Sequence, residues 1–128
     1  MVAEFDAWVE RVTSNCGASV AAFGFLLYEH EDSFAVQLVG AARYVDSDPF
    51  GSEVLCSSGE DLLDLPRTTV GPEWQQGLAA ATQLVRSYLA RRARGGPFDG
   101  STVAVGFVDG DMKVLQSAAT PNSSLHRT

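Results

Sequence analysis

Two cysteines and two histidines are the side chains of this sequence best suited to nucleophilic catalysis. A catalytic thiol needs a neighbouring base, but His30 falls in a predicted loop and His126 in a predicted tail. Cys16 lies on the apolar side of a predicted helix, where a thiol usually fills a core. Because the chain is long enough to form a stable core without disulfide bonds, we expect Cys16 and Cys56 to be reduced. The sequence therefore predicts no catalytic residue and a protein that is not an enzyme.

Two acidic segments could be considered as cation sites. Residues 29–32 read Glu-His-Glu-Asp, but adjacent side chains on one loop do not converge on an ion as ligands from two rigid elements do. Residues 46–53 carry acids at alternate positions and a glycine, but no twelve-residue loop with a terminal bidentate Glu follows. Solvated turns are the expected structure of both segments, and we predict neither a metal nor a cofactor.

The sequence offers little for the recognition of phosphate or nucleic acid. The segment Gly95-Gly96-Pro97 follows a predicted helix, whereas a phosphate-binding loop precedes one. The arginines at 91, 92 and 94 are explained by the negative end of the helix dipole. A net charge of −7 repels a phosphate backbone. We expect no nucleic-acid partner.

The charge of the chain is unevenly distributed. Residues 1–70 contain twelve acids and three arginines, a balance of −9, whereas residues 71–128 contain six bases and four acids, a balance of +2. Among so many carboxylates nothing singles out two as a glycosidase-type pair. A strongly acidic face attracts basic proteins, although a surface kept soluble by its charge explains the composition equally well. The charge distribution is therefore compatible with two interpretations: an acidic surface for a basic protein partner, and a surface whose charge only keeps the protein in solution.

The length of 128 residues suits one domain, and a hydrophobic share of 45% is ordinary for a globular protein. We predict a single α+β domain over residues 1–116 and a disordered tail over residues 117–128, which are small and polar. The beginning of the sequence has no basic region and no apolar run reaches the ~18 residues that span a bilayer. We therefore expect a cytoplasmic protein without membrane contact.

Apolar residues at helical spacing predict helices over residues 3–15 and from Pro72 to the Gly-Gly-Pro at 95–97. Trp8 and Trp74 lie on the apolar stripes of these two helices, so both are expected in the core. Between them, residues 52–57 suit a short strand, and residues 58–65 suit one helical turn that Pro66 ends.

Two hairpins complete the predicted fold. The first covers residues 19–28 and 34–44, and its first strand is apolar on both faces, which is typical of a central strand. The second covers residues 102–108 and 111–115 around Asp109-Gly110, a dipeptide that favours a two-residue type I′ turn. The fold class is therefore α+β: an antiparallel sheet of two hairpins, with about four or five strands and two main helices. The predicted order is α-β-β-(short β or turn)-α-β-β.

Several segments together carry a resemblance that covers residues 4–115 in layout. They are Phe-Leu-Leu-Tyr at 25–28, residues 36–44, Gly-Glu-Asp-Leu at 59–62, Leu-Pro-Arg at 65–67, Trp74, and residues 105–111. In this layout the chain resembles small acidic bacterial proteins that are found beside polymorphic toxins and are proposed as their immunity partners.

The resemblance implies a protein that binds and blocks a basic toxin domain, typically a nuclease, through an acidic face. Charge complementarity would speed the encounter, and one or two buried aromatic side chains would hold the complex. The contact residues expected on this hypothesis are Glu29, Glu31, Asp32, Asp46, Asp48, Phe50, Glu60 and Asp61.

Two other classes of function stay open. A small-molecule-binding module would contain a deep apolar pocket with a few convergent polar groups. A homo-oligomeric protein of unknown function would expose a large apolar patch that a second copy covers.

Overall fold

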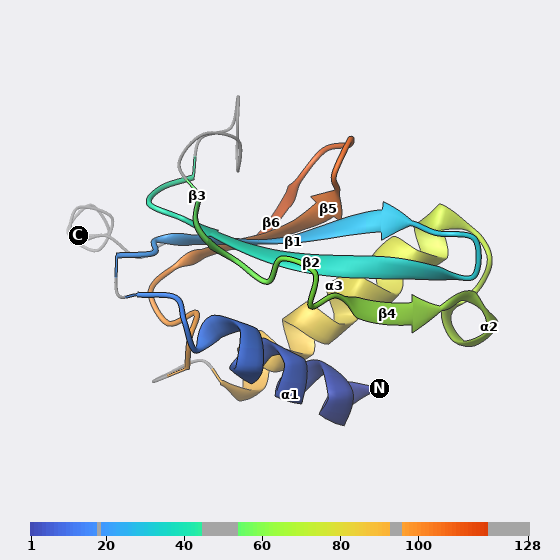
Figure 1. The fold of residues 1–128 in the computed structure, drawn as a ribbon, viewed down its shortest axis with the longest axis horizontal. Coiled ribbons are helices and arrows are strands. Elements are labelled where there is room, and N and C mark those ends of the chain that lie inside the picture. Colours follow the sequence, from blue (N-terminus) through green and yellow to red (C-terminus); the bar gives the residue numbers. More distant parts are fainter. Residues whose placement is uncertain (18, 45–53, 93–95, 118–128) are drawn as a thin grey trace, which may run out of the picture.

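A computed structural model describes residues 1–17, 19–44, 54–92 and 96–117 (Figure 1). Its helices are α1 (Val2–Thr13), α2 (Arg67–Val70) and α3 (Trp74–Arg91). Its strands are β1 (Ala22–Glu29), β2 (Ser33–Ala41), β3 (Val54–Ser57), β4 (Leu63–Pro66), β5 (Thr102–Phe107) and β6 (Lys113–Gln116). The two long helices, both predicted hairpins and the short strand at 54–57 are confirmed.

Among the described residues, six strands form one sheet in the order β3-β2-β1-β5-β6, and β4 pairs with the other half of β2. The prediction of a purely antiparallel sheet was wrong, because β1 and β5 pair in parallel from Ala22–Thr102 to Leu27–Phe107. The reason is that α3 carries the chain from one edge of the sheet to the other side of β1, so that β5 runs in the direction of β1. β1 is therefore central, as predicted.

Both long helices lie on one side of the sheet (Figure 1), which explains the pattern of side chains in the strands. Phe23, Phe25 and Leu27 alternate along β1 and are at most 3% exposed, since strand side chains alternate between the two faces. In β2 the alternate residues Phe34, Val36 and Leu38 belong to the same buried cluster.

Aromatic rings fill the space between the sheet and the helices. The Phe5 ring on α1 stacks on Phe25 at a centroid distance of 5.8 Å and meets Tyr88 on α3 edge-on at 6.1 Å. Trp8 is 1% exposed, which confirms its predicted place in the core. Ring pairs of this kind stabilise a core beyond the area they bury.

The middle of the chain differs from its predicted structure. The helical turn expected at 58–65 is replaced by the edge strand β4, which pairs with β2 from Leu63–Val36 to Pro66–Ser33. Pro66 favours extended backbone at the preceding residue and lacks an N–H, which an edge strand tolerates. The helix α2 begins after this proline instead of ending at it.

The second hairpin differs from its predicted turn. β5 ends at Phe107 and β6 begins at Lys113, and neither Asp109 nor Gly110 has a positive φ. A type I′ turn requires positive φ at both central residues, so that prediction was wrong. The amide of Gly110 donates to the carbonyl of Phe107 at 3.0 Å, which begins a wider turn.

The predicted place of Trp74 in the core was wrong, because 48% of its surface is exposed. The capping box of Glu73 and Gln76 begins α3, and the helix then turns the side of Ala81 and Val85 towards the sheet. The Trp74 ring lies beside this buried stripe and contacts the Phe107 ring at 6.1 Å.

Cys16 and Cys56 form a disulfide, so the expectation of reduced cysteines was wrong. The fold brings the residue that follows α1 next to β3, with the two Cα atoms 5.6 Å apart, a distance that suits a disulfide. Cys56 pairs with Gly40 of β2, where a Cβ would lie 2.6 Å from the Cys56 sulfur. The glycine therefore leaves the room that the bridge needs.

Candidate functional site

Three of the predicted contact residues lie in the turn between β1 and β2. Glu29 ends β1, and Glu31 and Asp32 follow it with exposed side chains. The amide of His30 donates to the carbonyl of Ser33 at 2.9 Å and closes this turn. The local sequence is therefore sufficient to place these three carboxylates together.

The parallel pairing of β1 and β5 adds the β5–β6 turn to the same end of the sheet. Parallel strands end on the same side, and the amide of Val108 extends the pairing by donating to the carbonyl of Leu27 at 3.0 Å. Asp109 and Asp111 follow with exposed side chains. We call Glu29, Glu31, Asp32, Asp109 and Asp111 the acidic end.

A shallow pocket of about 320 Å³ lies between the two turns and is lined by residues of both, including Tyr28, His30 and Val108. The side chain of Tyr28 is fixed, since its hydroxyl donates to Oε1 of Gln37 at 2.8 Å. Val108 is 50% exposed. Two carboxylates of the acidic end, Glu29 and Asp109, therefore line a pocket whose other side chains are both apolar and polar.

Arg67 is the basic side chain beside this site, and its contacts hold the β1–β2 turn. Its guanidinium donates to the carbonyl of His30 at 2.8 and 3.1 Å and lies 4.2 Å from the centre of the Phe34 ring. It also donates to the carbonyl of Pro72 and to Oε1 of Glu29, the latter at 3.4 Å. Arg67 thus joins the turn to the segment before α3 and neutralises one of the five carboxylates in part.

Asp61 was predicted as a contact residue, but its groups stabilise the fold. Arg11 of α1 donates to both of its carboxylate oxygens, at 2.7 and 2.9 Å, and Nε1 of Trp8 donates to its carbonyl at 2.7 Å. The hydrogen bonds from Arg11 hold the pKa of Asp61 below its usual range. Asp61 therefore anchors α1 to the connection between β3 and β4.

Glu60 is exposed but lies in the same connection, away from the acidic end. The amide of Ser58 in this connection donates to the carbonyl of Leu38, and Leu38 is five strand residues, or roughly 16 Å, from Ser33 at the turn. Asp46, Asp48 and Phe50 lie outside the described residues. The structure thus brings together Glu29, Glu31 and Asp32 of the predicted set.

Sequence reasoning missed Val108, Asp109 and Asp111 as members of the site. The dipeptide Asp109-Gly110 did indicate a turn, but its position beside Glu29 depends on the parallel pairing of two strands more than seventy residues apart. A signal for that pairing existed in the nearly continuous apolar run of the β5 segment. Such a run is typical of a parallel strand that is buried on both faces.

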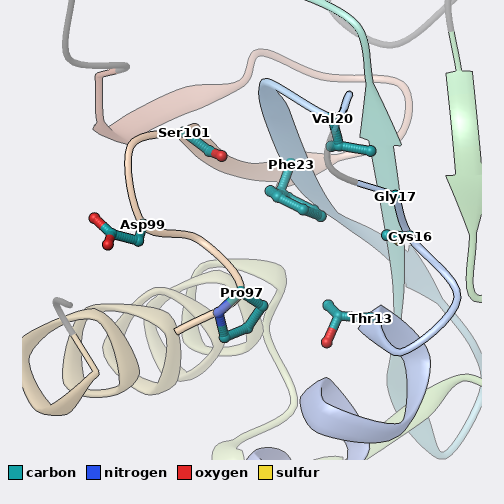
Figure 2. A pocket seen from close by; sticks show the side chains of 8 residues that line it. All are labelled: Thr13, Cys16, Gly17, Val20, Phe23, Pro97, Asp99 and Ser101. Carbon is teal, nitrogen blue, oxygen red and sulfur yellow. The ribbon is translucent and has the colours of Figure 1, made fainter. Parts of the chain in front are cut away.

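A second pocket of about 320 Å³ lies where α1 ends (Figure 2). Thr13 and Cys16 form one wall, and Pro97 and Ser101 lie across from them, with the Phe23 ring between the walls (Figure 2). The hydroxyl of Thr13 donates back to the carbonyl of Val9 at 2.7 Å. The volume of this pocket is at the lower limit for ligand pockets. Cys16 is in a disulfide and the Thr13 hydroxyl is hydrogen-bonded to the backbone, so neither side chain is a free nucleophile.

Both cysteines are bonded to each other, and within the part of the chain that the structure describes no three His, Cys, Asp or Glu side chains are grouped to hold a metal. Within the same residues no helix is both long and apolar enough to span a bilayer. The exposed acidic end can attract and bind a cationic surface.

No family model, no curated protein and no solved structure matches this chain.

Proposed function

We propose that this chain is a non-enzymatic protein-binding domain that neutralises a basic partner, in the manner of an immunity protein bound to a toxin. The observation that carries the proposal is the acidic end, where exposed carboxylates from two turns lie beside a pocket that Tyr28 and Val108 help to line. An arrangement of this kind suits a protein interface, which combines a charged rim with an apolar centre.

The charge of the acidic end supports fast and selective association with a basic protein. Glu31, Asp32 and Asp111 are exposed, and among the described residues none of them has an ion-pair partner. Their charges are part of the net charge of the chain, which is −7, and they concentrate negative potential at this end of the sheet. Electrostatic steering raises association rates above the ordinary 10⁵–10⁶ M⁻¹s⁻¹ by about 10- to 1,000-fold and falls with added salt.

The rigidity of the site supports tight binding. The β1–β2 turn is held by Arg67, and Tyr28 is held by Gln37, whose Nε2 in turn donates to the carbonyl of Gly59 at 3.0 Å. Groups that are already fixed lose little conformational entropy when a partner binds. Val108 is the exposed apolar side chain that the pocket offers to a partner.

The test is binding to a basic protein encoded by a gene next to that of this chain, measured by titration calorimetry and by cell survival on co-expression. The variant Glu31→Gln/Asp32→Asn/Asp111→Asn removes three charges from the acidic end. The control Glu4→Gln/Glu60→Gln/Asp64→Asn removes the same number of charges from exposed acids elsewhere. We expect the first variant to weaken binding by about 10- to 100-fold and the control to weaken it less than about threefold.

The proposal is contradicted if the two triple variants weaken binding equally, because overall charge would then act without a defined site. It is also contradicted if the neighbouring protein does not bind, or if the chain protects cells while the acidic end is neutralised.

A further inference from the structure

A second surface is formed by α3 and β6, in the half of the sequence whose charges sum to +2. It is a groove of about 490 Å³ between the outer side of α3 and the start of β6. Trp74, Leu78, Thr82 and Arg86 follow one another along α3 at intervals of four residues, and Lys113 faces them from β6. We call this surface the α3–β6 groove.

The apolar part of the groove is unusually exposed for a folded chain. Trp74 has 48% of its surface exposed although the rest of the neighbouring stripe is in the core. A tryptophan at such a position exposes a large apolar area to water, and tryptophan is the residue most enriched at energetically important interface positions. Contact with the Phe107 ring fixes the Trp74 ring on one side and leaves its other side open to the groove.

The charges of the groove indicate what binds there. Arg11, Arg67, Arg91 and Arg92 all form ion pairs with carboxylates of this chain. Arg86 and Lys113, in contrast, have no carboxylate partner among the described residues, and both line the same groove. On a chain that carries sixteen acids, two cations beside one apolar surface favour a ligand with apolar and acidic groups.

The length of the groove favours a peptide segment over a small anion. Trp74 and Arg86 are twelve residues apart on one helix, a distance of about 18 Å at 1.5 Å per residue. A helical peptide of three turns has this length, and amphipathic helices bind such grooves through residues at spacings of three and four.

We propose that the α3–β6 groove binds an acidic, amphipathic segment of a partner protein. Trp74 and Leu78 contact the apolar side of that segment, and Arg86 and Lys113 pair with its carboxylates. The proposal does not rest on the proposed function, because the acidic end binds cations and lies at the turns of the sheet.

The probe is a fluorescein-labelled peptide of twelve residues with leucines at helical spacing and glutamates at the flanking positions, and its binding is measured by fluorescence anisotropy. A second peptide carries lysine in place of glutamate. We expect the glutamate peptide to bind and the lysine peptide to bind at least tenfold more weakly. The emission of Trp74 should shift to shorter wavelength on binding, since Trp8 is already buried.

Two variants and a matched control locate the site. Trp74→Ala should weaken binding of the glutamate peptide by about tenfold or more. Arg86→Gln/Lys113→Gln should weaken it by about fivefold, as expected for two exposed ion pairs. The control Asn15→Asp/Ser117→Asp lowers the net charge by the same amount at exposed positions outside the groove lining and should bind as wild type does.

Four results would overturn the proposal. The first two are equal binding of the two peptides and equal weakening by the charge variant and its control. The third is a dimer of the wild-type chain that Trp74→Ala abolishes, because the occupant would then be a second copy. The fourth is binding of a medium-chain fatty acid in the groove without binding of the peptide. Glu31→Gln/Asp32→Asn, which changes only the β1–β2 turn, should leave peptide binding unchanged, so the two proposals can fail separately.

Discussion

Removal of the disulfide between Cys16 and Cys56 should destabilise the fold without changing its architecture. The bridge joins the end of α1 to the edge strand β3, and the two cysteines are 40 residues apart. Both ends of the closed loop belong to the hydrophobic core cluster or pack against it. The perturbation is the variant Cys16→Ser/Cys56→Ser, with Cys16→Ala/Cys56→Ala as a second form that adds no hydroxyl group.

The expected magnitude follows from the size of the loop. In the chain-entropy model a bridge across a loop of 40 residues restricts the unfolded chain by about 4 kcal/mol at 25 °C. Natural disulfides contribute about 2–5 kcal/mol, and domains of this size have a total stability of about 5–15 kcal/mol. We therefore expect a loss of about 2–4 kcal/mol, which is a substantial share of the free energy of unfolding.

The assay is urea unfolding followed by circular dichroism, with and without dithiothreitol. Wild type under oxidising conditions should have the highest midpoint, and wild type with dithiothreitol should unfold at the same urea concentration as the two double variants. A thiol titration of the unfolded wild-type protein should find no free thiol before reduction and two afterwards. Two free thiols before reduction would show that the bridge is absent, and a midpoint that dithiothreitol does not change would show that the bridge does not stabilise the fold.

Three further predictions concern single side chains. Tyr88→Phe should leave the free energy of unfolding unchanged or raise it by up to about 1 kcal/mol in a urea titration, because the buried Tyr88 hydroxyl has no hydrogen-bond partner among the described residues; a loss above 1 kcal/mol would reveal a missing partner. Asp61→Asn should cost about 1 kcal/mol or less at pH 7, since the ion pair with Arg11 is exposed. The pKa of Asp61 is lowered in the folded state from 3.8, so this stabilisation is present above that value and is lost as the pH falls through the lowered pKa. The melting curves of wild type and variant should therefore converge in acid. A constant difference between them down to pH 2 would contradict this prediction. Gly77→Ala should lower the melting temperature in calorimetry although alanine favours helices. The added Cβ would lie 2.6 Å from the Phe34 ring, and Arg67 covers that ring on one side. A higher melting temperature would show that the ring moves.

The parts of the fold that depend on local sequence could be predicted. The spacing of Phe5, Trp8 and Val12 defines α1, and alternation along β2 assigns Phe34, Val36 and Leu38 to the core. Local patterns do not say which distant strands pair, so the parallel contact between β1 and β5 was missed. The edge strand β4 was missed for a related reason, because its extended backbone is stabilised by pairing with β2.

The candidate site likewise has a part that local sequence determines and a part that only the fold brings together. Glu29, Glu31 and Asp32 are neighbours in sequence, so their grouping at one turn could be predicted. The contacts of Asp61 could not be predicted, because its partners Arg11 and Trp8 are about fifty residues away and only the fold brings them together. The disulfide required the same knowledge, since the sequence gives no distance between the end of α1 and β3.

A disulfide is typical of proteins that fold in an oxidising compartment. The sequence-based expectation of a cytoplasmic protein therefore depends on the redox state of Cys16 and Cys56 in the cell. Trapping of free thiols by alkylation at the moment of lysis would determine that state and would separate the two environments.

Binding of a basic partner at the acidic end can be located by hydrogen–deuterium exchange of the chain with and without a basic protein encoded by a neighbouring gene. We expect protection on binding to be concentrated in residues 28–32 and 107–111. Protection confined to other segments, with these two turns unchanged, would contradict it.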